Sequence, residues 1–206
     1  MRSVIAVVAR ILFAGAVCLN LLAGCSTKQS PLLTSASPLW PQHLAVLEGM
    51  DQWAFQGRIA VKDGTDSWSM KLNWAQTNEH FDIRIIAPFG QGAAHLYGND
   101  EFAVIDVPER PQMSAPSAEE LLRHHIGWTV PLEGLKYWLA GRPDPDLMMS
   151  GEWDALGRLN QLTQSGWYIT YKRYSTVAGI DLPRKIELIN DQLRVKLVID
   201  RWQLDS

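Results

Sequence analysis

The side chains that could carry acid–base or metal chemistry are few, and their spacing favours no catalytic arrangement. His124 and His125 are adjacent, so on a helix they would point about 100° apart and would not share a metal ion. Asp144 and Asp146 stand in a proline-containing loop, where we expect exposed acids rather than a catalytic pair. The sequence contains no nucleophile elbow, no zinc-protease motif and no P-loop. We therefore expect no enzyme, no metal site and no cofactor.

Cys25 is the one residue whose surroundings indicate covalent chemistry. Arg2 and Arg10 precede or flank an apolar run over residues 11–23, which is shorter than the roughly 20 residues that span a bilayer. The run ends in Leu22-Ala23-Gly24-Cys25, which is typical of the lipobox of bacterial lipoproteins. Such a cysteine resembles one that is diacylated on sulfur and, after cleavage, acylated on its new amino group. An ordinary secretory leader with an accidental cysteine is the alternative.

The chain then divides into three segments. We expect residues 1–24 to be the lipoprotein signal peptide, 25–39 a lipid-anchored flexible tether rich in Ser, Thr and Pro, and 40–206 a single domain. Ser26 follows the cysteine, and the absence of aspartate there implies sorting to the outer membrane in Gram-negative bacteria. The leader removes two arginines, so the mature chain has 17 basic against 22 acidic residues, a net charge of −5. This balance argues against a nucleic acid partner.

The body of the chain is predicted to form a series of antiparallel strands. Large apolar residues alternate with polar ones, most clearly in the stretch 67–74, and this period of two is typical of half-buried strands. The predicted strands cover residues 55–61, 67–74, 81–85, 94–97, 102–107, 158–164, 166–174, 182–189 and 193–204. A sheet of this size is expected to curl, with one apolar face and one wet face.

Three short helices with apolar faces accompany these strands. Ser37 would cap the first, over residues 40–47, and Ser117-Ala118-Glu119-Glu120 predicts a capping box at the start of the second. The third is expected to begin at Pro131 or the next residue and to be closed by Gly141. These elements predict a mainly β domain, an open antiparallel half-barrel covered by a helical lid. The residues alone leave open whether the lid covers a packed core or an apolar cavity.

The loop Ile85–Gly92 carries an apolar ring where loops are usually polar. Phe89 stands between Pro88 and Gly90, which favour a tight turn. Two placements are compatible with the residues: the ring projects into its surroundings, or it folds back onto the edge of the barrel.

Taken in order, several stretches resemble the LolB family of outer-membrane lipoproteins. They extend over nearly the whole mature domain, from about Trp40 to Trp202. The matching stretches are Phe55-Gln56-Gly57-Arg58, Leu72-Asn73-Trp74, Ala87-Pro88-Phe89-Gly90, Gly127-Trp128-Thr129-Val130-Pro131-Leu132, Gly166-Trp167-Tyr168-Ile169-Thr170-Tyr171, Leu182-Pro183 and Val195-Lys196-Leu197.

The resemblance implies a receptor that accepts lipoproteins from the periplasmic carrier LolA, holds their acyl chains in an apolar cavity and inserts them into the outer membrane. It implies a protein held by Cys25 on the periplasmic face, with Phe89, Pro88 and Gly90 as a membrane-targeting loop. Family members commonly carry leucine where this chain has Phe89. We expect a monomer.

The candidates for contact with acyl chains are the apolar face of the strands and one tryptophan of the lid. They are Trp68, Met70, Leu72, Trp74, Ile83, Ile85, Leu96, Trp138, Ile169, Tyr171, Leu197 and Ile199. Two other functions remain open at this point: a structural envelope lipoprotein that acts as an assembly scaffold without lipid cargo, and a hydrolase of envelope lipid or glycan.

Overall fold

The computed structural model describes residues 37–64, 66–88, 92–126 and 131–204, all of which lie in one compact unit, Ser35–Ser206. Within these ranges, none of the helices has the length and hydropathy that a membrane-spanning helix requires. Cys25, Phe89, Gly90 and the stretch 127–130 lie outside the described residues.

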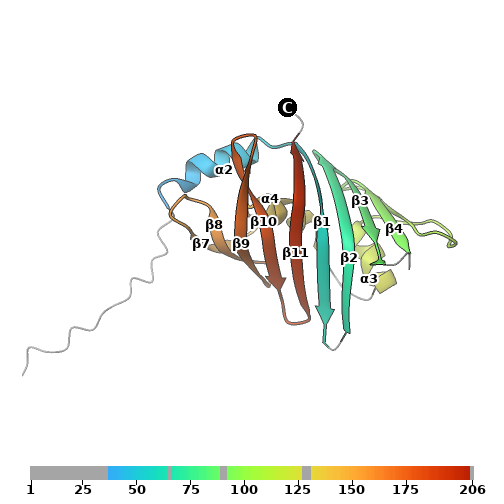
Figure 1. Ribbon diagram of the computed structural model, residues 1–206. Coiled ribbons are helices and arrows are strands. Elements are labelled where there is room, and N and C mark those ends of the chain that lie inside the picture. The colour runs from blue at the N-terminus through green and yellow to red at the C-terminus, as the bar shows by residue number, and fades with distance from the viewer. Residues whose placement is uncertain (1–36, 65, 89–91, 127–130, 205–206) are drawn as a thin grey trace, which may run out of the picture. The chain divides into compact units, whose positions relative to one another are not determined.

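The described residues form one antiparallel sheet of eleven strands, in the order β6-β5-β4-β3-β2-β1-β11-β10-β9-β8-β7 (Figure 1). The chain enters at the centre with β1, steps outward through hairpins to β6, and returns from β7 to β11, which pairs with β1. The strands are β1 (Gln52–Asp63), β2 (Asp66–Thr77), β3 (His80–Ile86), β4 (Ala93–Gly98), β5 (Ala103–Asp106), β6 (Met113–Ala115), β7 (Met149–Trp153), β8 (Leu159–Gln164), β9 (Trp167–Val177), β10 (Ile180–Ile189) and β11 (Leu193–Leu204).

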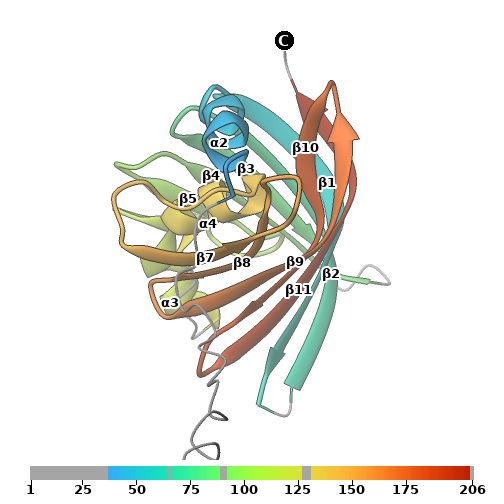
Figure 2. The same cartoon turned by 90° about the vertical axis from the view of Figure 1, so that its left-hand side faces the viewer.

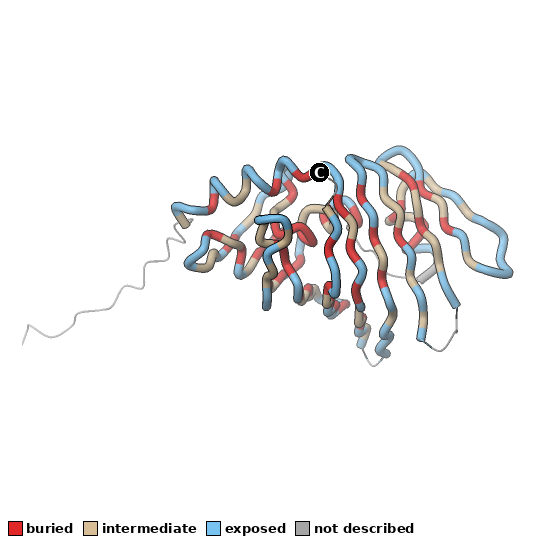
Figure 3. Tube along the Cα trace, turned by 45° about the horizontal axis from the view of Figure 1, so that its top comes forward, coloured by how far each residue is buried: buried red, intermediate tan, exposed pale blue. Residues whose placement is uncertain are grey.

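Burial alternates along the central strands, as the period of two predicts. On β2, Leu72 and Trp74 are buried, whereas Lys71 before them and Ala75 after them are exposed and Asn73 between them is half-buried. The same change from buried to exposed is visible along the neighbouring strands in Figure 3. The sheet therefore has one apolar concave face and one solvated face.

The contact between β1 and β11 depends on a glycine. The register shifts between Gln56 and Gly57, which marks a β-bulge. A Cβ atom on Gly57 would lie 2.5 Å from the carbonyl oxygen of Val198 on β11. Any larger residue would push the two central strands apart, so the close approach requires glycine here.

Two helices connect the edges of the sheet. α3 (Ala118–Ile126) and α4 (Leu132–Ala140) follow β6 and precede β7, so the chain crosses from one edge to the other over the concave face (Figure 2). The side chain of Ser117 accepts a hydrogen bond from the Glu120 N–H at 3.2 Å, as the capping box predicts. Gly141 closes α4 in the left-handed conformation with φ of 86°.

The first helix, α2 (Trp40–Glu48), begins differently from the prediction. Its N-cap is Leu39. The Ser37 side chain lies before the helix, where its hydroxyl oxygen accepts a hydrogen bond from the Leu39 N–H at 3.4 Å. Ser37 begins a separate turn that precedes the helix, because the Trp40 N–H donates to the Ser37 carbonyl at 2.9 Å. The helix still buries the expected face through Trp40 and Leu47.

The two edge strands, β6 and β7, are absent from the predicted strands. β6 has three residues and β7 has five, which is too short for an alternation to be recognised. The remaining architecture agrees with the prediction, since an open antiparallel sheet with inserted helices is confirmed.

Candidate functional site

A cavity of about 590 Å³ lies between the concave face of the sheet and the helices α3 and α4. Of the 21 described residues that line it, 20 are apolar, and the exception among them is Asp63 at the end of β1. Its volume lies within the range of about 300–1,000 Å³ that is usual for small-molecule pockets. The lining has almost no group that could hold a polar ligand, so the cavity suits an apolar guest.

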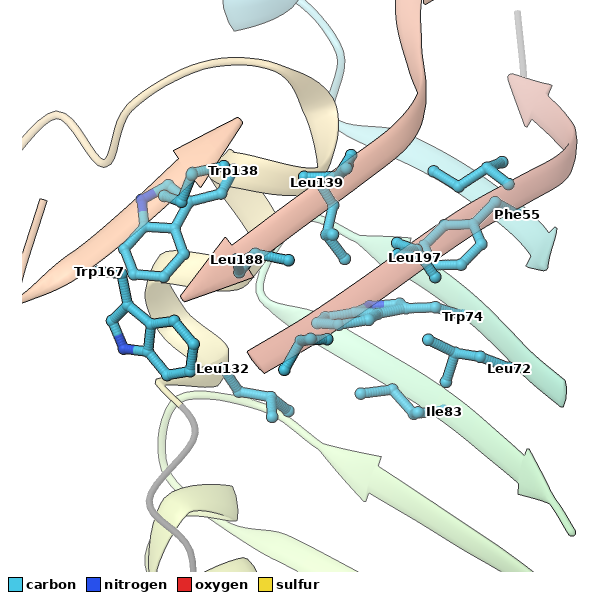
Figure 4. Packing of buried hydrophobic residues seen from close by; sticks show 14 of the residues in the cluster. Phe55, Leu72, Trp74, Ile83, Leu132, Trp138, Leu139, Trp167, Leu188 and Leu197 are labelled. Carbon is cyan, nitrogen blue, oxygen red and sulfur yellow. The ribbon is translucent and has the colours of Figure 1, made fainter. Parts of the chain in front are cut away.

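Both helices supply apolar side chains to the cavity. Leu132, Leu135 and Leu139 of α4 line it, and their spacing places them on one face of the helix. Figure 4 shows Leu132 and Leu139 on the helix side of the space, with Leu72 and Ile83 of the sheet beyond it. The helices therefore act as one wall of the cavity.

Polar contacts hold α4 in this position. The Lys136 ammonium lies 3.5 Å from a carboxylate oxygen of Asp100 in the β4–β5 turn, and 3.4 Å from Glu133. The Glu133 N–H donates to the Glu119 carboxylate of α3 at 3.3 Å. Burial opposes the charge on Lys136, but these two acids outweigh it and raise its pKa. Helix α4 is thus fastened to a hairpin of the sheet and to α3.

An aromatic cluster borders the cavity at Trp74. The rings of Trp53, Phe55, Trp74 and Trp202 lie 5.3 to 6.4 Å apart, centroid to centroid. The indole N–H of Trp74 donates to Gln76 at 2.9 Å, and that of Trp202 donates to the Pro183 carbonyl at 2.8 Å. These buried rings fill the interior at this end, so no guest can occupy it.

The opposite end of the cavity is more exposed. Along β2 the lining continues from Trp74 to Trp68, beside the β1–β2 turn, and Trp68 is 39% exposed. Asp63, the last residue of β1, stands at the start of this turn opposite Asp66 and is half-buried. The cavity therefore runs from a closed aromatic end to an end where water reaches its lining.

Eight of the twelve candidate residues lie along this cavity. They are Trp68, Met70, Leu72, Trp74, Ile83, Ile85, Leu96 and Leu197. The structure places the other four, Trp138, Ile169, Tyr171 and Ile199, in the core away from the lining. Alternation assigns the strand residues among them to the buried face of the sheet, but it does not tell how far the cavity extends along that face.

The contacts of Trp138 explain why this tryptophan of the lid lies outside the cavity lining. Its indole N–H donates to the Gln164 side chain of β8 at 2.7 Å, and its ring lies 6.3 Å from that of Trp167. The Tyr171 hydroxyl donates to the Trp138 carbonyl at 3.0 Å, and complete burial raises the pKa of Tyr171 far above its ordinary value. These residues fasten α4 to the sheet.

Sequence reasoning missed thirteen lining residues, including Asp63. Most lie on β1, β10, β11 and α4, where the same periods of two and of three to four residues were available. Among the described residues they are Ile59, Val61, Asp63, Ala94, Ile105, Leu122, Leu132, Leu135, Leu139, Trp167, Leu188, Leu193 and Val195.

The acidic and histidine candidates do not form a catalytic site. Asp144 is buried, contrary to the expectation of an exposed loop acid, because its carboxylate accepts from the Asp146 N–H at 3.1 Å and its own N–H donates to Gln164 at 2.9 Å. These bonds shape a turn. His124 is exposed and lies 3.8 Å from Glu120. Where the structure describes the chain, no cluster of three potential metal ligands occurs.

The loop after β3 is described only at its ends. Pro88 is exposed, and the Ala87 N–H donates to the Gly92 carbonyl at 3.0 Å, which closes the base of the loop. The candidate residues Phe89 and Gly90 lie outside the described residues, as does Cys25.

A family model described as outer membrane lipoprotein LolB matches residues 51–202. The chain belongs to the LolB family. The LolB protein of Nitrosococcus oceani is 40% identical over 189 residues, which cover 90% of this chain and 94% of that protein. The LolB protein of Pseudomonas aeruginosa is 36% identical over 200 residues, which cover 93% and 95%.

Solved structures show the same fold at low sequence identity. A LolA superfamily protein from Nitrosomonas europaea has a TM-score of 0.50 at 10% identity, with 80% of this chain and 94% of that chain covered. A putative outer membrane lipoprotein-sorting protein domain from Vibrio parahaemolyticus has a TM-score of 0.50 at 7% identity, with 82% and 91% covered.

Membership of the LolB family confirms the resemblance seen in the sequence. The protein is an outer-membrane lipoprotein of the lipoprotein localisation pathway, and it is a receptor rather than an enzyme. The expected location in the outer membrane is confirmed as well.

Proposed function

We propose that this LolB family protein accepts acylated lipoproteins from the periplasmic carrier LolA, holds their acyl chains in the cavity and releases them into the outer membrane. The observation that carries the proposal is the cavity of about 590 Å³ with 20 apolar residues in its lining. The eight lining residues of the candidate set, from Trp68 on β2 to Leu197 on β11, would contact the acyl chains.

Transfer energetics explain why such a cavity is needed. Each methylene that leaves water contributes about 0.8 kcal/mol, so burial of about 12 methylenes of one acyl chain is favourable by about 10 kcal/mol. A lipoprotein with several chains would not cross the periplasm unshielded. Without an energy source at the outer membrane, transfer must run downhill from carrier to receptor to bilayer.

The mature protein would work close to the membrane as a monomer. Residues 1–24 would be removed as the signal peptide, Cys25 would carry the lipid anchor, and the segment 25–39 would be the tether of the domain 40–206. This arrangement keeps the cavity at the periplasmic face of the outer membrane.

The loop that contains Phe89 would touch the bilayer during release. Burial of one phenylalanine side chain is worth about 1.5–3 kcal/mol, which orients the domain but does not anchor it. Phe89→Glu should fold and accept cargo from LolA as the wild type does, yet deliver it to outer-membrane vesicles more slowly. Delivery at the full wild-type rate would exclude the membrane role of this side chain.

The transfer step itself has a direct test. LolA loaded with a fluorescent lipoprotein is mixed with the mature chain that carries Cys25→Ala, and the two proteins are separated. We expect the label to move to the Cys25→Ala chain. If the label stays on LolA, the transfer function is wrong, and an assembly scaffold without lipid cargo becomes the better account.

A further inference from the structure

The solvated face of the sheet carries a group of exposed basic side chains at its centre, on the side opposite the helices α3 and α4 (Figure 2). They belong to five neighbouring strands, β2, β1, β11, β10 and β9. We call this group the basic face, and its members are Lys71, Arg58, Lys62, Arg194, Lys196, Lys185 and Arg173.

The strand register aligns four of these side chains in one row. Arg58 of β1 pairs with Lys71 of β2 on one side and with Val198 of β11 on the other. Val198 pairs in turn with Lys185 of β10, and Lys185 pairs with Arg173 of β9. Arg58 and Lys71 are adjacent in sequence to residues that line the cavity, so the row points away from the cavity.

The other three basic side chains lie closer to the β1–β2 turn. Lys62 of β1 pairs with Arg194 of β11, and Lys196 lies two residues further along the same strand. Glu187 of β10 is the register partner of Lys196. Its carboxylate lies 3.2 Å from the Arg194 guanidinium and 3.8 Å from the Lys196 ammonium, so one acid serves two cations.

Two carboxylates do not neutralise this face. Besides Glu187, Asp200 contacts the Arg58 guanidinium at 2.8 Å. Seven cations against these two acids give a net charge of +5, although the mature chain as a whole carries −5. Four of the cations form no ion pair with any residue that the structure describes, namely Lys62, Lys71, Lys185 and Arg173.

This arrangement of charges is unfavourable for folding. Like charges that stand directly opposite each other on neighbouring strands are destabilising. The basic face contains three such pairs, Arg58 with Lys71, Lys62 with Arg194, and Lys185 with Arg173. An anionic partner on this face would relieve their repulsion.

The distribution of apolar side chains favours a lipid surface over a protein as that partner. Protein interfaces have an apolar core and a polar rim, and they are depleted in lysine. Here the order is reversed, because Ala60 and Val198, which lie among the charges, are half-buried. The exposed apolar side chains Ile86 and Tyr168 lie at the margins. Exposed lysines and arginines without an apolar centre suit the diffuse attraction to anionic lipid head groups.

We propose that the basic face binds the anionic head groups of the membrane to which the protein is anchored. The inference rests on the proposed function for the lipid anchor at Cys25. Because the anchor and its tether keep the domain near the bilayer, several weak contacts suffice to orient it. In this orientation α3 and α4, on the opposite side of the sheet, face the periplasm, from which LolA arrives (Figure 2).

Flotation with lipid vesicles tests the inference on the mature chain that carries Cys25→Ala, which lacks the anchor. The vesicles contain phosphatidylcholine alone or with about 30% phosphatidylglycerol, which makes their surface negative. We expect binding to the anionic vesicles at low salt and little binding to the neutral ones. At about 0.5 M salt, binding to the anionic vesicles should be at least about tenfold weaker, because the charges are screened.

Removal of two unpaired charges should weaken this binding. Lys71→Gln together with Lys185→Gln should bind anionic vesicles at least about tenfold more weakly, since each basic residue near such a surface contributes about fivefold. Its unfolding midpoint in urea should be no lower, because two like-charge repulsions disappear. The matched control is Arg110→Gln together with Arg123→Gln, which removes the same charge from exposed residues of the β5–β6 loop and of α3 and should leave vesicle binding unchanged.

Several results would overturn the inference: equal binding to both kinds of vesicle, binding to neither, or an equal loss in the two double variants. A Lys71→Gln, Lys185→Gln chain that binds anionic vesicles normally but takes cargo from LolA more slowly would overturn it too, because the face would then dock an acidic protein. A fluorescent acyl probe reports on the cavity separately. Normal probe binding without salt-sensitive vesicle binding contradicts this inference alone, and absence of probe binding contradicts the proposed function alone.

Discussion

At the scale of single residues, Arg158 shows how a charged side chain can fasten two parts of the sheet. Its guanidinium contacts Asp154 at 2.6 Å and Asp181 of β10 at 3.1 Å, and it stacks on the Tyr174 ring at 4.6 Å. The Tyr174 hydroxyl donates to the Leu159 carbonyl of β8 at 2.6 Å. Such partly buried, charge-assisted hydrogen bonds to two carboxylates are stronger than exposed ion pairs.

Asp154→Asn should lower stability in a pH-dependent way. Burial opposes ionisation of Asp154, but hydrogen bonds from Arg158 and Leu156 outweigh it and hold its pKa below the ordinary value. The carboxylate therefore contributes stability above the unfolded-state pKa of about 3.9, and this contribution is lost as the pH falls through the lower folded-state pKa.

At neutral pH we expect Asp154→Asn to reduce the free energy of unfolding by about 1–3 kcal/mol. The difference from the wild type should shrink as the solution is acidified below about pH 4. Urea unfolding at several pH values measures it, with the exposed Asp66→Asn as the control. A difference that is the same at every pH would show that the charge of Asp154 plays no part.

At the scale of elements, Gln164 joins three segments of the chain. Its side-chain oxygen accepts from the Trp138 indole of α4 and from the Asp144 N–H, at 2.7 and 2.9 Å. Its amide group donates to the carbonyls of Asp144 and Leu147, both at 3.0 Å. One buried amide of β8 thus positions the helix that forms a wall of the cavity and the turn that follows it.

Gln164→Leu should be strongly destabilising, because it leaves the Trp138 indole and the Asp144 backbone buried without partners. We expect a loss of roughly 2–5 kcal/mol in the free energy of unfolding, measured by denaturant titration. Gln161→Leu on the same strand is the control, since Gln161 accepts from Tyr168 at the surface. Equal effects of the two substitutions would mean that the buried network is not what holds α4.

The same elements show what the sequence could and could not reveal. Period-two alternation found β1, β2 and β11, and Gly141 marked the end of α4, because these signals are local. The burial of Asp144 and the position of Trp138 depend on Gln164, which lies 20 residues from Asp144 and 26 residues from Trp138 in the sequence. Such contacts between distant residues leave no periodic signal. Asp63 was missed for a related reason, since a charge beside a turn is ordinarily exposed.

At the scale of the whole domain, the order of the strands creates the cavity. Because β1 and β11 pair at the centre, the edges β6 and β7 lie at opposite sides of the sheet, and α3 and α4 must span the distance between them. The helices leave about 590 Å³ between themselves and the concave face.

The central claim is that this space holds acyl chains, and titration with a fluorescent acyl probe tests it most directly. Ala94 lines the cavity and Ala75 lies exposed on the other face of the sheet, so Ala94→Trp fills the cavity and Ala75→Trp serves as the matched control. We predict saturable binding of the probe to the mature chain that carries Cys25→Ala. With Ala94→Trp added, binding should be at least about tenfold weaker, which corresponds to a loss of about 1.4 kcal/mol or more in binding free energy. With Ala75→Trp added instead, the affinity should be unchanged. Equal affinity in all three proteins, or no saturable binding to any of them, would contradict the account.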